Sequence, residues 1–276
     1  MKTILVTTDF SSNSKSAIRF AIQLSAQTAC QFVFYNVLEI NAPTSWPKAE
    51  VEKYLASELD KGKQQMKKFL DKLFQQHKVQ HLNYQYEVAI GNDVSSLIMS
   101  FAKSKGVDYI CMGTRGAGIF QKFIGTHASA LVNASVIPVI VVPKNYRFRS
   151  IQTVGYSSDL EHIEEEFSTV LAFSHSIGAS TQVYHFNMKS TKANKKKQQE
   201  LQARLGTGNA TFFCITQKVD DTFVENLQRT VRRKKPSVLI MFSKFKPNWI
   251  QRLFFTGFTA TMTFELSIPL ISFRKN

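Results

Sequence analysis

The same series of apolar runs occurs once in each half of the chain. This internal repeat constrains the fold more than any other feature of the sequence. The segment Thr-Ile-Leu-Val-Thr-Thr-Asp at residues 3–9 corresponds to Thr-Val-Gly-Tyr-Ser-Ser-Asp at residues 153–159. Four further apolar runs follow in the same order in each half. Such a repeat indicates a duplicated structural unit. Because 276 residues suffice for two ordinary domains, we predict one domain over residues 1–146 and another over residues 147–276.

Each half alternates between patterns typical of strands and of helices. Short β-branched or aromatic runs between polar turns predict strands at residues 3–7, 31–37, 82–88, 109–112 and 139–142, and again at 153–159, 182–186, 209–216, 238–242 and 268–273. Apolar residues at a period of 3.6 predict helices at residues 14–28, 51–77, 94–105 and 128–133. This alternation favours an α/β fold of two tandem Rossmann-like domains, each a five-stranded parallel sheet flanked by helices.

The last strand of each half is unusually apolar. Ile-Pro-Val-Ile-Val-Val ends the first half at residues 137–142, and Ile-Pro-Leu-Ile-Ser-Phe ends the second at residues 268–273. Either segment would present a flat apolar edge if it stood alone, and such edges promote association. We therefore predict that the two strands pair within one chain as an intramolecular pseudo-dimer, which leaves a further homodimer open.

The net charge of +15 is unusually high. The rest of the composition, with 43% hydrophobic and 20% charged residues, is typical of a globular protein. Two basic runs stand out, at residues 192–197 and 232–235. Such runs can bind nucleic acid by releasing counterions from phosphates. Cations also gather at helix C-termini, where the helix dipole favours them. We favour solvated helix ends over a nucleic-acid partner.

The apolar run lengths, the N-terminal segment and the cysteines together predict a cytoplasmic protein without a membrane segment. No apolar run approaches the ~20 residues that cross a bilayer, and the N-terminus lacks the features of a secretory signal. The three cysteines, Cys30, Cys111 and Cys214, are scattered and odd in number. That usage favours free thiols in a reducing compartment.

One glycine-rich segment follows the fourth strand and precedes a helix. It contains Gly113, Gly116 and Gly118, and it ends in Gly125 and Thr126. Glycines let backbone N–H groups approach a ligand without an intervening side chain. A helix that begins at Thr126 directs further free N–H groups and a positive dipole end to the same place, which suits phosphate. A glycine-rich turn without a ligand is the alternative reading.

An Asp that closes the first strand, a Gly-x-x-Gly after the fourth and a Gly-Thr before the last helix together resemble the ATP-binding class of the universal stress protein family. The resemblance covers the whole chain as two copies and implies the adenine nucleotide alpha hydrolase-like form of the Rossmann fold. It also implies an ATP site, with Mg²⁺ as a possible companion of the phosphates. By position, the implied contacts are Asp9 with the nucleoside, Val37 with adenine, Gly113 near the ribose, and Gly116, Gly125, Thr126 and His127 with the phosphates.

This sequence departs from the family pattern in both halves. Eight residues separate Gly116 from Gly125, where the family pattern has nine. In the second half Phe242, Phe245 and Phe255 stand where the family has glycines. A phenylalanine side chain would fill the space that a phosphate needs. We therefore predict a nucleotide site in the first half only.

These patterns favour a regulatory ATP-binding protein of the stress response whose nucleotide state alters its association with other proteins. Metal-ligating clusters, a nucleophile elbow and a Walker loop are missing from the sequence, so the case for an enzyme is thin. Two other hypotheses stay open. One is an interaction scaffold that binds no nucleotide, and the other is a slow ATPase or phosphotransfer protein that uses Thr126 or His127.

Overall fold

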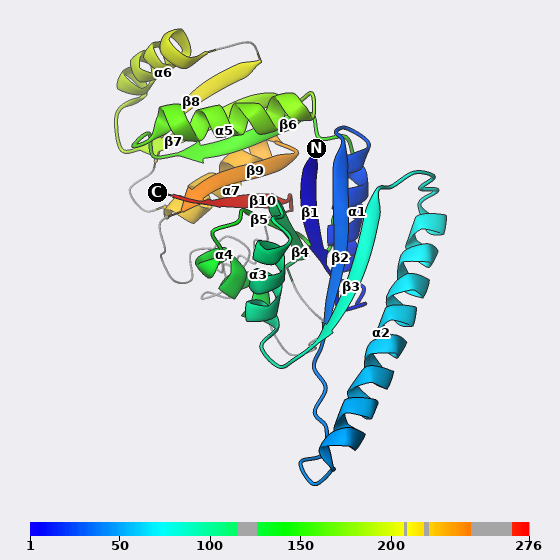
Figure 1. Ribbon diagram of the computed structural model, residues 1–276. Helices are drawn as coiled ribbons and strands as arrows, with labels where there is room; N and C mark the ends of the chain where they lie inside the picture. Colours follow the sequence, from blue (N-terminus) through cyan, green and yellow to red (C-terminus); the bar gives the residue numbers. More distant parts are fainter. Residues whose placement is uncertain (115–125, 207–208, 218–220, 244–266, 276) are drawn as a thin grey trace.

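The ten strands that the structure describes belong to one sheet, with helices on both of its faces (Figure 1). The computed structural model describes residues 1–114, 126–206, 209–217, 221–243 and 267–275. The strand order is β3-β2-β1-β4-β5-β10-β9-β6-β7-β8. Counted outward from the centre of the sheet, the strands of the second half therefore follow the same order as those of the first half. Among the described residues, no helix is both long and apolar enough to cross a membrane.

The described part of the first half contains five parallel strands and four helices. The strands are β1 (Lys2–Thr7), β2 (Cys30–Leu38), β3 (Tyr84–Ile90), β4 (Tyr109–Gly113) and β5 (Val139–Val142). The helices are α1 (Lys15–Ser25), α2 (Lys48–Gln76), α3 (Val94–Ser104) and α4 (Thr126–Ala134). Each lies where the apolar pattern predicts it, with ends that shift by a few residues. For example, α2 begins at Lys48, directly after Pro47 and three residues before the expected start.

The second half follows the same plan. Its strands are β6 (Thr153–Ser158), β7 (Ser180–Asn187), β8 (Ala210–Thr216), β9 (Val238–Ser243) and β10 (Leu270–Arg274). Its described helices are α5 (Ile163–Ser176), α6 (Thr191–Leu205) and α7 (Phe223–Lys234). The basic run at residues 232–235 forms the last turn and C-cap of α7, as the helix-end interpretation predicts. The run at residues 192–197 instead lies in the N-terminal part of α6.

The two halves join through their last strands. β5 and β10 are antiparallel neighbours, whereas every other neighbouring pair in the sheet is parallel. Ile140 lies opposite Ile271, and both are fully buried. The predicted pairing of the two apolar edges is therefore confirmed.

Two apolar layers, one on each face of the sheet, run through both halves. The layer under α1, α2, α5 and α6 contains Ile140 beside Ile271. The layer under α3, α4 and α7 contains Val141 beside Leu270. Because each layer crosses the β5–β10 junction, the two halves share their cores.

Gln27, just beyond the end of α1, links the halves by hydrogen bonds. Its Nε2 donates to the carbonyl oxygens of Ile151 and Ile177, each at 3.0 Å. Its Oε1 accepts from the Ile151 N–H at 2.8 Å. The C-terminal end of α1 is thereby fixed to the start of β6 and the end of α5.

Candidate functional site

The carboxyl edge of the first half is the place where this topology binds ligands. Strand order reverses at β1, which lies between β2 and β4, and open parallel sheets bind ligands outside the carboxyl ends of such strands. Asp9 follows β1, Val37 lies near the end of β2, and Gly113 ends β4. Thr126 and His127 begin α4. The fold therefore brings these five predicted residues to one edge of the sheet.

A tight turn fixes Asp9 at the end of β1. The Thr8 hydroxyl oxygen accepts a hydrogen bond from the Phe10 N–H at 3.1 Å, and Asp9 Oδ1 accepts one from the Ser11 N–H at 3.0 Å. Phe10 has a φ of 63°, a left-handed conformation that is uncommon outside glycine. Within the described part of the chain, Asp9 Oδ2 has no hydrogen-bond partner. That oxygen can therefore accept a hydrogen bond from a ligand.

Asn36 and Thr114 place two more acceptors at this edge. Asn36 donates through Nδ2 to the Thr8 carbonyl oxygen at 2.7 Å, while its Oδ1 is buried without a partner among the described residues. Thr114 follows β4, and its buried Oγ1 also lacks a partner there. A buried polar atom without a hydrogen bond costs about 1–3 kcal/mol. Both positions therefore suit a polar ligand.

The sequence patterns did not single out Asn36 or Thr114. An asparagine inside the apolar run of β2 is the available signal, because buried polar side chains need partners. Thr114 has no comparable signal, since a threonine after a strand is ordinary. Its burial, with 1% of its surface exposed, appears only in the folded structure.

His127 is exposed at the start of α4, and its Nδ1 lies 3.0 Å from the Ser95 Oγ of α3. The contact joins the first turns of α3 and α4. Gly116 and Gly125 lie outside the described residues, and the Thr126 side chain is not described. The assignment of these residues and of His127 to phosphate therefore stays a prediction.

The second half repeats the Asp9 turn atom for atom. Ser158 Oγ accepts from the Leu160 N–H at 3.0 Å, and Asp159 Oδ1 accepts from the Glu161 N–H at 3.0 Å. Leu160 has a φ of 68°. His185 takes the register position of Asn36, with Nδ1 3.1 Å from the Ser158 carbonyl oxygen. Because a carbonyl oxygen can only accept, Nδ1 carries the proton.

Lys275 distinguishes the second edge from the first. Its side chain is 4% exposed, and Nζ lies 2.5 Å from Asp159 Oδ2, 3.1 Å from Glu161 Oε2 and 3.7 Å from Glu166 Oε1. Glu166 also accepts a hydrogen bond from the Tyr156 hydroxyl. The ammonium group of Lys275 therefore pairs with Asp159 Oδ2. The corresponding oxygen in the first half, Asp9 Oδ2, has no such partner among the described residues.

The charges in this cluster shift one another's pKa values. Burial opposes the charged form of Lys275, but hydrogen bonds to Asp159 and Glu161 outweigh it and raise the lysine pKa. Burial likewise acts to raise the pKa of Asp159, and Lys275 more than offsets this, so the pKa lies below its usual range. Burial dominates at Glu166 and raises its pKa. At neutral pH Lys275 and Asp159 therefore form a charged pair.

Phe242 takes the register position of Gly113 in the second half. Its ring stacks on Phe273 with centroids 4.9 Å apart and meets Tyr156 edge-on at 5.7 Å. An aromatic cluster thus fills a position that is a glycine in the first half. Phe245 and Phe255, the other two predicted replacements, lie outside the described residues.

The sequence pattern of the universal stress protein family matches residues 1–143, more than half of the chain. The chain belongs to this family. Membership confirms the resemblance to the family, and the likeness to its ATP-binding class stays a prediction. A comparison with curated protein sequences found no match.

Solved structures of universal stress proteins share the fold of the whole chain. One from Archaeoglobus fulgidus DSM 4304 superposes with a TM-score of 0.69 at 12% identity and covers 99% of this chain and 98% of its own. A putative universal stress protein from Pseudomonas aeruginosa UCBPP-PA14 has a TM-score of 0.59 at 10% identity, over 99% and 93% of the two chains. At these identities the likeness shows the fold alone.

Proposed function

We propose that this universal stress protein is a cytoplasmic, ATP-binding regulator of the stress response that holds one nucleotide in a domain formed by residues 1–146. The observation that carries the proposal is the contrast between two aspartates in the same turn. Asp9 has an available oxygen, whereas Asp159 pairs with Lys275. The domain of residues 147–276 then binds no nucleotide and serves as the partner of the first.

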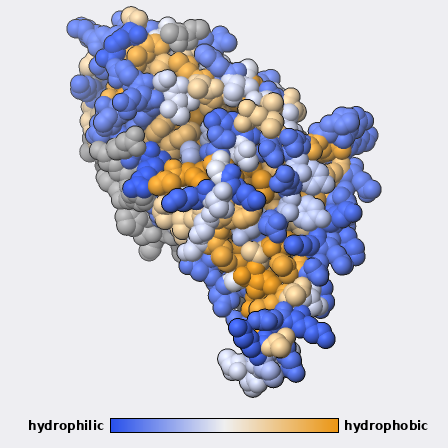
Figure 2. Space-filling model, in the orientation of Figure 1, coloured by the Kyte–Doolittle hydropathy of each residue, from blue (hydrophilic) through white to orange (hydrophobic). Residues whose placement is uncertain are grey.

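The first edge offers the groups that a nucleoside requires. Asp9 Oδ2 and Asn36 Oδ1 are acceptors for hydroxyl or amino groups, and Val37 is partly exposed nearby on β2. Figure 2 shows apolar side chains gathered in the lower middle of the view, over the region where Figure 1 places the carboxyl ends of β2 and β3. Apolar walls with a few placed polar groups are typical of small-molecule sites.

The triphosphate would lie toward α4 and the glycine segment before it. The N-terminus of α4 at Thr126 supplies free N–H groups and a positive dipole end. Residues 109–127 contain the cations Arg115 and Lys122 and no Asp or Glu. Their charge complements the phosphates, with or without Mg²⁺. We assign ATP a regulatory role, in which its presence alters association with other proteins.

Affinities for ATP and adenosine, measured by calorimetry on two variants, test this proposal. Asp9→Ala should weaken both ligands at least tenfold, because one hydrogen bond to a charged group contributes roughly 1.5–3 kcal/mol. Gly125→Val should weaken ATP by at least as much and spare adenosine, which has no phosphates. Circular dichroism verifies each fold. If folded Gly125→Val binds ATP as tightly as the wild type, the phosphate assignment is wrong, and the scaffold hypothesis replaces it.

A further inference from the structure

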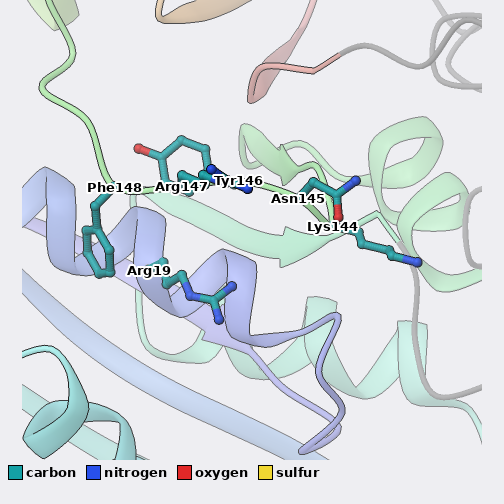
Figure 3. A pocket seen from close by; sticks show the side chains of 6 residues that line it. All are labelled: Arg19, Lys144, Asn145, Tyr146, Arg147 and Phe148. Carbon is teal, nitrogen blue, oxygen red and sulfur yellow. The ribbon is translucent and has the colours of Figure 1, made fainter.

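The connection between β5 and β6 runs along α1 and forms a pocket with it. The pocket has a volume of about 600 Å³. Figure 3 shows the Arg19 side chain on α1 below the connection, which supplies the other lining residues. These are Lys144, Asn145, Tyr146, Arg147 and Phe148. Three of the six lining side chains are therefore cations.

The two segments that form the pocket contain no acidic residue. Residues 10–38, which include α1, and residues 109–158, which include the connection, have no Asp or Glu. In the part of the chain that the structure describes, Arg19, Lys144 and Arg147 have neither an ion pair nor a side-chain hydrogen bond. Tyr146 adds no negative charge, because burial raises its pKa to about 12. The positive charge of the pocket is therefore unbalanced.

His77, at the end of α2, borders the pocket. Its ring lies 4.6 Å from the ring of Phe148, centroid to centroid, and its Nε2 is buried without a partner among the described residues. Burial and then the charge of Arg19 lower the pKa of His77. The imidazole is thus neutral at neutral pH and sensitive to whatever binds beside Arg19 and Phe148.

We propose that this pocket binds a small phosphorylated anion, separately from the ATP site. Arginine side chains form two parallel hydrogen bonds with phosphate oxygens, and Arg19 and Arg147 are both available for this. The volume lies within the range of about 300–1,000 Å³ that is usual for small-ligand pockets. Phe148, which is 37% exposed, offers an apolar contact at the rim. None of the lining residues belongs to the candidate nucleotide site.

The place of the pocket suggests what such a ligand would do. The C-terminal end of α1 is already tied to the second half through Gln27. An anion between Arg19 and Arg147 would tie the middle of α1 to the connection as well. The ligand would therefore stabilise the arrangement of the two halves.

The test is a titration with inorganic pyrophosphate of protein whose histidines are isotope-labelled. Nuclear magnetic resonance monitors the histidine signals at each step. His77 reports on the pocket and His127 on the start of α4, so the two sites are read separately. We expect a saturable shift of the His77 signals. The double variant Arg19→Gln/Arg147→Gln should weaken this response at least tenfold, since it removes two charged donors. The control Lys192→Gln/Lys196→Gln removes the same charge from the exposed face of α6 and should change the affinity less than twofold.

Two results would overturn the proposal. One is a His77 signal that does not move saturably, or that responds equally in wild type and the Arg19→Gln/Arg147→Gln variant. The other is tighter binding of a single-stranded RNA decamer that is lost in the Arg19→Gln/Arg147→Gln variant, which would indicate a nucleic-acid surface instead of a small-anion pocket. A response of His127 to ATP that survives in the arginine variant leaves the proposed function intact in either case.

Discussion

The turns at the carboxyl edges of β1 and β6 have matching backbone conformations and different side-chain partners. Asp9 and Asp159 lie in turns with matching hydrogen bonds and matching left-handed residues. The first aspartate keeps an oxygen available, while the second is paired with Lys275. The lesson is that a duplicated scaffold keeps one turn geometry around two different sets of side chains, so the fold alone does not reveal which copy functions.

The second edge satisfies its polar groups with side chains of the chain itself. A buried carboxylate without a partner is unfavourable. Lys275 places a cation 3.7 Å from the buried Glu166 and also pairs with the more exposed Asp159, 116 residues away in sequence. The Phe242 ring packs where the first half has Gly113. The first edge lacks both features in the described residues, and its polar groups Asn36 and Thr114 stay without partners there. A ligand would supply them.

The largest expected effect concerns the junction that makes the two halves one body. Ile140→Ala and Ile271→Ala should each lower the free energy of unfolding by about 2–5 kcal/mol, because both side chains are fully buried. Since the two residues lie opposite each other, the double variant should differ from the sum by at least ~0.5 kcal/mol. Urea unfolding measures all three. Val136→Ala, at an exposed residue, is the control, and strictly additive losses would mean that the halves do not share a core.

A smaller effect separates the two edges directly. Lys275→Met should lower the free energy of unfolding by about 1–3 kcal/mol, because it leaves the buried Glu166 and the partly exposed Asp159 without their cation. Lys144 occupies the corresponding position after β5 and is exposed. Lys144→Met should change stability by less than about 0.5 kcal/mol. Equal effects of the two substitutions would show that Lys275 has no special role.

The Lys275→Met loss should also depend on pH. Without the ammonium, the pKa of Glu166 rises further and that of Asp159 returns toward its usual value. Both changes disfavour the charged carboxylates in the folded state, so the loss grows as the pH rises from about 4 to about 7. Unfolding in urea at both pH values measures it. A loss that is larger in acid would have the wrong sign for this account.

The smallest effect is expected at the link between α1 and the second half. Gln27→Ala removes three hydrogen bonds to backbone groups of residues 151 and 177. Because it leaves those groups partly buried, the expected loss is about 1–2 kcal/mol. Gln75→Ala, at an exposed residue of α2, should be neutral. A neutral Gln27→Ala would mean that water replaces the glutamine without cost.

The elements and the junction were predictable because both follow from local patterns. Apolar periodicity locates strands such as β5 and β10, and their flat apolar edges predict their pairing. The Lys275 cluster was not predictable in this way. Lysine and glutamate are usually surface residues, and only the fold brings Lys275 to Asp159 and Glu166. The acid-free segments around Arg19 and Arg147 were visible in the sequence, but the pocket between them depends on the path of the chain.

The number of ATP molecules bound per chain tests the central claim most directly. Calorimetric titration should give one site in the wild type, one in Asp159→Ala and none in Asp9→Ala at concentrations that saturate the wild type. The two substitutions are matched, since they remove the same side chain from the same turn in the two halves. Two equivalent sites in the wild type, or loss of binding in Asp159→Ala with Asp9→Ala unaffected, would contradict the account.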